Sequence, residues 1–168
     1  MQGVQIFCII LIITIMVEPQ RFFISVQAIL KAGNEVLVIH KSKAFYDGQP
    51  LDVWALPGGK IDPNEHEMEA LERELKEELD FNWDKSKNPA VYAGYYLDNH
   101  SENSFKGGIS VCILKYLIEI DEKFNVPEND EEFDKAEWIS WRDFLELRFH
   151  SRKVPMKELL NGIAIQKF

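Results

Sequence analysis

A glycine pair followed by a glutamate-rich segment constrains this chain more than any other feature. Glycines at 58–59 end an apolar run, and residues 65–79 then mix apolar and acidic side chains with the period of a helix. At about 100° per residue, Glu77 and Glu78 lie within about 60° on either side of Glu74. The three carboxylates therefore share one side of the predicted helix.

The neighbouring side of the same helix is apolar, with Met68, Leu71, Leu75 and Leu79 at helical spacing. This stripe predicts a helix that packs on a core and presents its carboxylates on an adjacent solvated face. Like charges at this spacing cost a few tenths of a kcal/mol. Mg²⁺ ions, which bind carboxylate and carbonyl oxygens, would make such a cluster useful. The helix alone leaves open a second interpretation, a solvated acidic face without function.

The rest of the chain predicts short strands and two closing helices. Strands are expected at 22–30, 35–40, 52–56, 91–97, 109–120 and 136–140, helices at 65–79, 141–147 and 156–160, and loops at 31–34, 41–50 and 125–135. The loop at 41–50 is predicted from its polar residues and an Asp-Gly pair. Strands and segregated helices in one compact unit predict an α+β fold.

Size, charge and cysteine usage exclude several classes of protein. The 168 residues suit one domain, and a net charge of −9 disfavours binding to nucleic acid because like charges repel. Small phosphorylated substrates remain compatible if divalent metal ions lie between them and the carboxylates. Cys8 and Cys112 form no disulfide framework and fit a reducing compartment, so we expect a cytoplasmic protein.

The first 17 residues are set apart by an almost continuous apolar run at 4–17. As a helix it would rise only about 21 Å, short of a hydrocarbon core of about 30 Å, so a membrane role is disfavoured. Its β-branched residues favour an added strand, while a membrane tether or a chain start at Met16 are the alternatives. We divide the chain into an apolar extension at 1–17 and a domain at 18–168.

One family pattern accounts for the glutamate-rich segment. The chain matches Gly-x5-Glu-x7-Arg-Glu-(aliphatic)-x-Glu-Glu-x-Gly-(apolar) at Gly59, Glu65, Arg73, Glu74, Leu75, Glu77, Glu78 and Phe81. This pattern resembles the box of the Nudix hydrolases, a MutT-like family, with Asp80 in place of the last glycine. Aspartate tolerates the left-handed conformation that a glycine would adopt there. The segment at 54–59 and the order of elements over about 20–165 are also similar to the family.

The resemblance implies a fold and a reaction. The fold would be a Nudix-type α/β/α sandwich with a mixed sheet. The reaction would be cleavage of the diphosphate bond of a nucleoside diphosphate linked to another moiety, with Mg²⁺ or Mn²⁺ and water. Tyr95 and Tyr96 stand where many ADP-ribose-cleaving members carry a proline. A nucleoside triphosphate or a nucleotide-sugar is therefore favoured. The alternative is a catalytically silent module that binds a nucleotide or regulates a partner, and the pattern leaves a homodimer open.

The resemblance also assigns roles residue by residue. It implies metal binding by Glu74, Glu77, Glu78 and the Gly58 carbonyl, and structural support by Gly59, Glu65 and Arg73. The general base would be Glu77 or Glu78 in some family members. In others it would be a glutamate in the loop before a late tryptophan strand, a place that Glu132 fits. Tyr46 and Tyr96 offer aromatic faces for substrate, and Lys41 is either a phosphate contact or a surface lysine.

Overall fold

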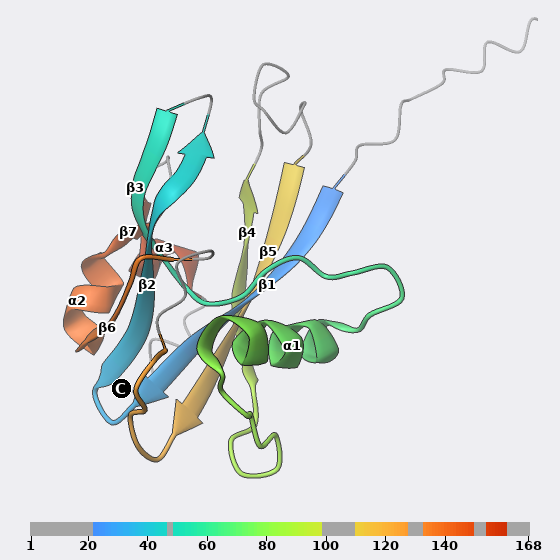
Figure 1. The fold of residues 1–168 in the computed structure, drawn as a ribbon, viewed down its shortest axis with the longest axis vertical. Helices are drawn as coiled ribbons and strands as arrows, with labels where there is room; N and C mark the ends of the chain where they lie inside the picture. The colour runs from blue at the N-terminus through green and yellow to red at the C-terminus, as the bar shows by residue number, and fades with distance from the viewer. Residues whose placement is uncertain (1–21, 47–48, 99–109, 128–132, 150–153, 161–168) are drawn as a thin grey trace, which may run out of the picture.

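The fold is known from a computed structural model that describes residues 22–46, 49–98, 110–127, 133–149 and 154–160 (Figure 1). The strands are β1 (Phe22–Ala32), β2 (Glu35–Tyr46), β3 (Gln49–Ala55), β4 (Val91–Asp98), β5 (Ser110–Ile120), β6 (Lys135–Ser140), β7 (Arg148–Phe149) and β8 (Val154–Pro155). The helices are α1 (Glu67–Leu79), α2 (Trp141–Glu146) and α3 (Met156–Leu159). These elements confirm the predicted α+β class.

The main sheet has the order β3-β2-β1-β5-β4, with β6 paired to β2. Strands β1 and β5 run parallel and pair along their whole length, from Phe22 with Ser110 to Ala32 with Ile120. The other pairs in this sheet are antiparallel, so the sheet is mixed, as predicted.

Two apolar cores lie on opposite faces of this sheet. On one face, Leu71, Leu75 and Leu79 of α1 pack against residues of β1 and β5 such as Val26 and Ile118. On the other face, residues of α2 and α3 pack against Ile29 of β1 and Leu117 of β5; they include Trp141, Phe144 and Met156. The helices thus flank the sheet as an α/β/α sandwich (Figure 1).

The predicted loop at 41–50 is wrong. Strand β2 continues to Tyr46 and β3 begins at Gln49, and the two form a long hairpin with a register shift between Lys41 and Ala44. Cross-strand pairing supplies the backbone hydrogen bonds that the polar composition of this segment did not reveal. Element ends elsewhere shift by one to three residues, and the β1–β2 turn is shorter than predicted, with Gly33 at a φ of 57°.

Two of the sequence-based predictions lie outside the described residues. These are the apolar extension at 1–17 and the candidate base Glu132. Within the described ranges, no helix is both long and apolar enough to cross a membrane.

Candidate active site

The glycine turn is built onto the edge of β1. Strand β2 has only two register pairs with β1, at the end next to their connecting turn. Beyond them, the chain at 57–61 takes the freed edge: the Val26 and Ala28 amides donate to the Gly59 and Pro57 carbonyls, at 2.8 and 2.9 Å. The central sheet therefore fixes the position of the turn.

Gly58 lies tightly against β1 while its amide points to the helix. Its φ is 131°, and a Cβ added to it would lie 2.2 Å from the Val26 carbonyl oxygen, so only glycine fits. Its amide donates a 2.7 Å hydrogen bond to the Glu78 carboxylate. Its carbonyl accepts none of the hydrogen bonds formed among the described residues, whereas the carbonyls on either side of it are used by β1.

Helix α1 is capped at both ends by the residues that flank it. His66 is the N-cap, and its amide donates to the Glu69 carboxylate at 2.9 Å. At the other end Asp80 has a φ of 51°, the left-handed conformation expected for it, and its amide donates to the Leu75 and Lys76 carbonyls. The substitution of the last glycine of the box therefore keeps the shape of the helix end.

Glu78 is buried beneath the glycine turn, with its side chain 3% exposed. Besides the Gly58 amide, it contacts the Lys41 ammonium at 3.2 Å. Burial raises the pKa of Glu78, while Lys41 and the Gly58 amide act in the opposite direction. The prediction that Glu78 belongs to a solvated face is wrong, because the turn extends over the part of the helix next to its apolar stripe.

Arg73 connects the other carboxylates of the segment. Its guanidinium binds both oxygens of Glu65 at 2.8 and 2.9 Å, and contacts Glu74 at 2.8 Å and Glu77 at 3.1 Å. It also donates to the Lys60 carbonyl at 3.0 Å. The guanidinium holds the pKa of Glu65 at about 2, and the three carboxylates raise the pKa of Arg73 above its ordinary value. Arg73 thus connects α1 to the loop that precedes it.

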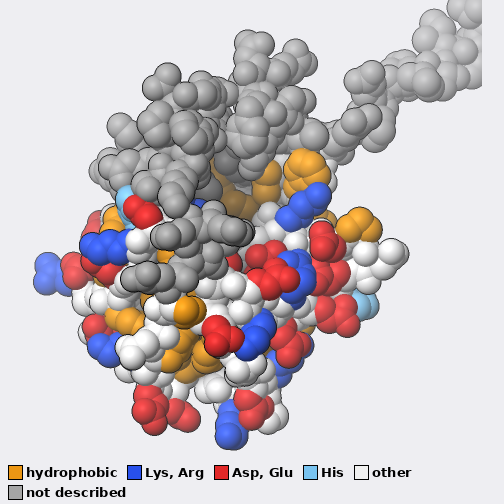
Figure 2. All heavy atoms as spheres, viewed as in Figure 1, with side chains coloured by type: hydrophobic (Ala, Val, Ile, Leu, Met, Phe, Trp, Pro, Cys, Tyr) orange, Lys and Arg blue, Asp and Glu red, His pale blue; other side chains and the backbone are white. Residues whose placement is uncertain are grey.

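Glu74 lies directly against the second glycine of the turn. A Cβ added to Gly59 would come within 2.5 Å of all three atoms of the Glu74 carboxyl group. Glu74 is largely buried, whereas Glu77 is exposed on the outer side of the helix. Gly59 therefore leaves room for the Glu74 carboxylate, and the helix presents the Glu77 carboxylate to solvent. In Figure 2, acidic and basic side chains intermingle over the region of α1.

The donor atoms gathered here have the chemistry that a hard cation prefers. The Glu74, Glu77 and Glu78 carboxylates and the Gly58 carbonyl are all oxygen donors, as Mg²⁺ requires. Among the residues that the structure describes, no three acidic, His or Cys side chains are grouped closely enough to hold a metal ion together. Instead, the carboxylates are paired with Arg73 and Lys41. The donor atoms therefore suit Mg²⁺, and in this structure the positive charges of Arg73 and Lys41 neutralise the carboxylates.

The structure thus brings together most of the predicted site residues. The residues brought together are Gly58, Gly59, Glu65, Arg73, Glu74, Glu77 and Glu78. Tyr96 is half-buried on β4, and it pairs with Ile113 on β5. The side chain of Tyr46 lies outside the description, although its backbone belongs to β2.

Sequence reasoning missed three features near these elements. Lys41 forms an ion pair with Glu78, a contact between residues 37 positions apart that no local pattern shows. His40 lies 2.8 Å from the Asp134 carboxylate. Lys115 is 2% exposed within β5. For Lys115 a signal was present, a single lysine inside the apolar run at 111–118.

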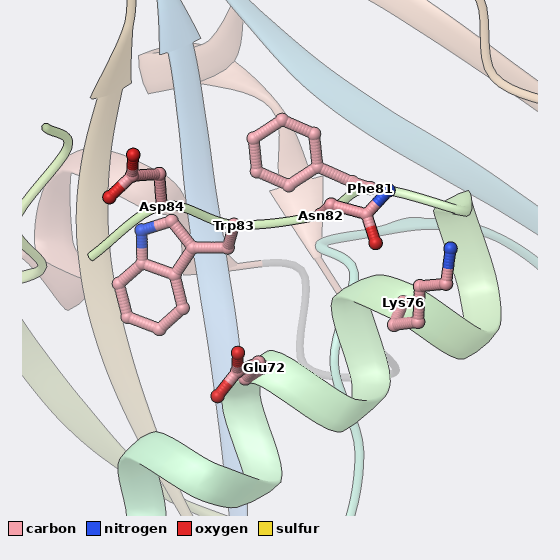
Figure 3. A pocket seen from close by; sticks show the side chains of 6 residues that line it. All are labelled: Glu72, Lys76, Phe81, Asn82, Trp83 and Asp84. Atoms are coloured by element: carbon pink, nitrogen blue, oxygen red, sulfur yellow. The ribbon is translucent and has the colours of Figure 1, made fainter. Parts of the chain in front are cut away.

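A separate hollow of about 350 Å³ lies along α1, lined by Glu72, Lys76, Phe81, Asn82, Trp83 and Asp84 (Figure 3). At 100° per residue, Glu72 and Lys76 lie on the side of the helix opposite Glu74. The Trp83 ring nitrogen already donates to the Asn88 carbonyl at 2.7 Å. This hollow is therefore no part of the carboxylate site.

Comparison with known proteins identifies the family. The sequence model of the NUDIX domain matches residues 21–160. This chain belongs to the NUDIX family. No curated protein matches the chain. As a Nudix hydrolase it acts on acid anhydrides in phosphorus-containing compounds, and a divalent metal is typical of the family.

Solved structures share the fold of this Nudix hydrolase at low sequence identity. The MutT protein from Methanosarcina mazei is 20% identical, with a TM-score of 0.55 over 80% of this chain and 88% of its own. The C. elegans Ap4A hydrolase is 18% identical, with a TM-score of 0.62 over 87% and 99%. The E. coli dihydroneopterin triphosphate pyrophosphohydrolase is 13% identical, with a TM-score of 0.62 over 80% and 92%.

Proposed function

We propose that this Nudix hydrolase cleaves the diphosphate bond of a small nucleotide, a nucleoside triphosphate or a nucleotide-sugar, with Mg²⁺ or Mn²⁺ and water. The observation that carries the proposal is the buried Glu78 carboxylate held against the Gly58 amide, beside the Arg73-linked carboxylates of the same helix. Two similar folds belong to an Ap4A hydrolase and a dihydroneopterin triphosphate pyrophosphohydrolase, which supports a substrate of this class.

In this proposal Glu74, Glu77, Glu78 and the Gly58 carbonyl hold the metal. A bound metal would polarise the phosphate oxygens and lower the pKa of the attacking water. Arg73 keeps the carboxylates of α1 in register with the preceding loop through Glu65 and the Lys60 carbonyl. Gly59 leaves the space that Glu74 occupies.

The proton of the attacking water needs an acceptor within hydrogen-bond reach. We assign this role to Glu77 or Glu78, with Glu132 as the alternative from the loop before β6. Glu77 is exposed and can contact a water directly. Glu78 is buried, and its carboxylate already accepts a hydrogen bond from the Gly58 amide. Tyr46 and Tyr96 are proposed to contact the part of the substrate that is not hydrolysed.

The decisive experiment compares two glutamate-to-glutamine variants of helix α1. Glu78→Gln keeps the shape and an acceptor for the Gly58 amide but removes the charge, whereas Glu72→Gln changes an exposed residue that is paired with Lys85. With Mg²⁺ and a panel of nucleoside triphosphates and nucleotide-sugars, we expect Glu78→Gln to lose at least about 100-fold in turnover. Glu72→Gln should match the wild type. Full turnover in a folded Glu78→Gln protein would refute the proposed metal site.

A catalytically silent nucleotide-binding module is the second candidate. The pairing of all three carboxylates with Arg73 or Lys41 is the observation that favours it. Nucleotide binding without hydrolysis by the full chain, across the same panel and with both metals, would establish this function instead.

A further inference from the structure

Lys115 is a buried lysine that the carboxylate site does not use. It lies in the middle of β5, its side chain 2% exposed. Within the described residues, it forms no hydrogen bond or ion pair, and its ammonium lies 5.8 Å from the centre of the Tyr96 ring. An ammonium has three donors, and burying it without acceptors is costly. Lys31 shows the contrast, since its ammonium has the Glu119 carboxylate at 3.0 Å.

The side chain of Lys115 projects from the sheet face opposite α1. Leu117, two residues further along β5, belongs to the core beneath α2 and α3, and alternate residues of a strand share a face. Lys115 pairs in register with Gln27 on β1 and with Gly94 on β4. Lys115 thus lies between a half-buried glutamine on one neighbouring strand and a residue without a side chain on the other.

The same row adjoins the glycine turn. Gln27 stands between Val26 and Ala28, whose amides hold the turn on the edge of β1. A Cβ added to Gly58 would lie 2.9 Å from the Gln27 Cα. A substrate whose diphosphate is bound at the turn would therefore have its attached group close to the row of Gln27 and Lys115.

We propose that Lys115 and Gln27 form a recognition site for the nucleobase of the substrate and select bases with a –CO–NH– edge, as in guanine and uracil. This inference rests on the proposed nucleotide substrate. Lysine only donates, so it matches the carbonyl oxygen of that edge, and the glutamine amide oxygen accepts from the adjacent ring N–H. Adenine and cytosine present an amino group where lysine needs an acceptor. Burial lowers the pKa of Lys115 to about 8, so the ammonium is the main form at neutral pH.

The test measures base preference rather than activity alone. With the full chain and Mg²⁺, kcat/KM is compared for GTP, ITP and UTP against ATP and CTP. We expect the wild type to favour the first group about 10- to 100-fold, the range for hydrogen bonds to a charged donor. ITP keeps the –CO–NH– edge but lacks the 2-amino group, so it should behave like GTP.

Two variants separate recognition from packing. Lys115→Met keeps the length of the side chain without donors, and Gln27→Leu removes the amide; each should lower the preference at least about tenfold. Lys31→Met removes a buried lysine on the same face and should leave the preference unchanged. An unchanged preference in a folded Lys115→Met protein would overturn the inference, as would equal use of all five nucleotides by the wild type.

A wild type that hydrolyses neither these nucleotides nor the nucleotide-sugars of the panel would refute the proposed function and leave the recognition site open to a direct test. Binding of GMP and AMP to the full chain is then measured by calorimetry. Tighter binding of GMP that Lys115→Met abolishes would support the recognition site without turnover. Equal binding of both, or no binding of either, would overturn it.

Discussion

Replacing Lys115 with methionine should make this protein more stable at neutral pH. Burial lowers the pKa of Lys115 to about 8, and the nearby Cys112 only partly opposes this effect. Relative to an ordinary lysine pKa of about 10.5, the protonated form in the folded state is disfavoured by about 3 kcal/mol. Methionine fills a similar volume and carries no charge. The Lys115→Met variant should therefore gain up to about 3 kcal/mol at pH 7.

The pH dependence gives this prediction its sign. Below about pH 8 the lysine is protonated in both the folded and unfolded states, and the full cost is present. Between about pH 8 and 10.5 the unfolded chain binds more protons, so the stability of the wild type rises with pH. The gap between variant and wild type should shrink to about 1 kcal/mol near pH 9.5.

Urea unfolding followed by tryptophan fluorescence, at pH 7 and 9.5, measures both gaps. Lys31→Met is the control: its ammonium is paired with Glu119, so its removal should bring no gain. A Lys115→Met protein that is no more stable than the wild type at pH 7 would refute the argument. So would a gap that stays constant with pH.

Three further substitutions test the turn and the helix end. Gly58→Ala should destabilise the fold by more than about 2 kcal/mol in urea unfolding, because φ is 131° and the Cβ would meet the backbone of Val26. Gly59→Ala displaces the carboxyl group of Glu74 rather than any backbone, so unfolding should change by less than about 1 kcal/mol while turnover falls; normal turnover would contradict the role of that contact. Asp80→Gly should raise stability by about 0.5 to 1 kcal/mol, since it relieves a left-handed φ of 51° and loses only an exposed ion pair with Lys76. A loss of stability in the Asp80→Gly variant would show that this ion pair contributes more than its exposure suggests.

Local patterns predicted the parts of this protein that depend on local interactions. Helix α1 follows from periodicity, and its C-terminal end was predicted at the observed residue with Asp80 in the left-handed conformation, although the helix begins two residues later than predicted. The spacing of the box likewise brought Glu65, Arg73 and Glu74 together, because they lie on one helix and the loop before it.

The features that sequence could not predict depend on contacts between distant segments. The β2–β3 hairpin is strand because each half supplies hydrogen bonds to the other, although its composition is polar. Helical angles place Glu78 beside the apolar stripe, but only the position of the turn decides that it is buried. The position of Lys115 within the apolar run of β5 can be read from the sequence. Only the three-dimensional structure shows that this lysine has no carboxylate partner among the described residues.

The attachment of the glycine turn to β1 limits how this family member can vary in length. Alternate carbonyls of the segment at 57–59 bond to β1, which leaves the Gly58 carbonyl on the other side. Inserting or deleting a single residue before Gly59 would reverse this alternation, as a slip of one residue does in any strand pair. The Gly58 carbonyl would then face β1 and its neighbours would face the helix. The stretch at 62–64 gives no freedom either, because the box fixes the spacing from Gly59 to Glu65 and Arg73 binds both oxygens of Glu65.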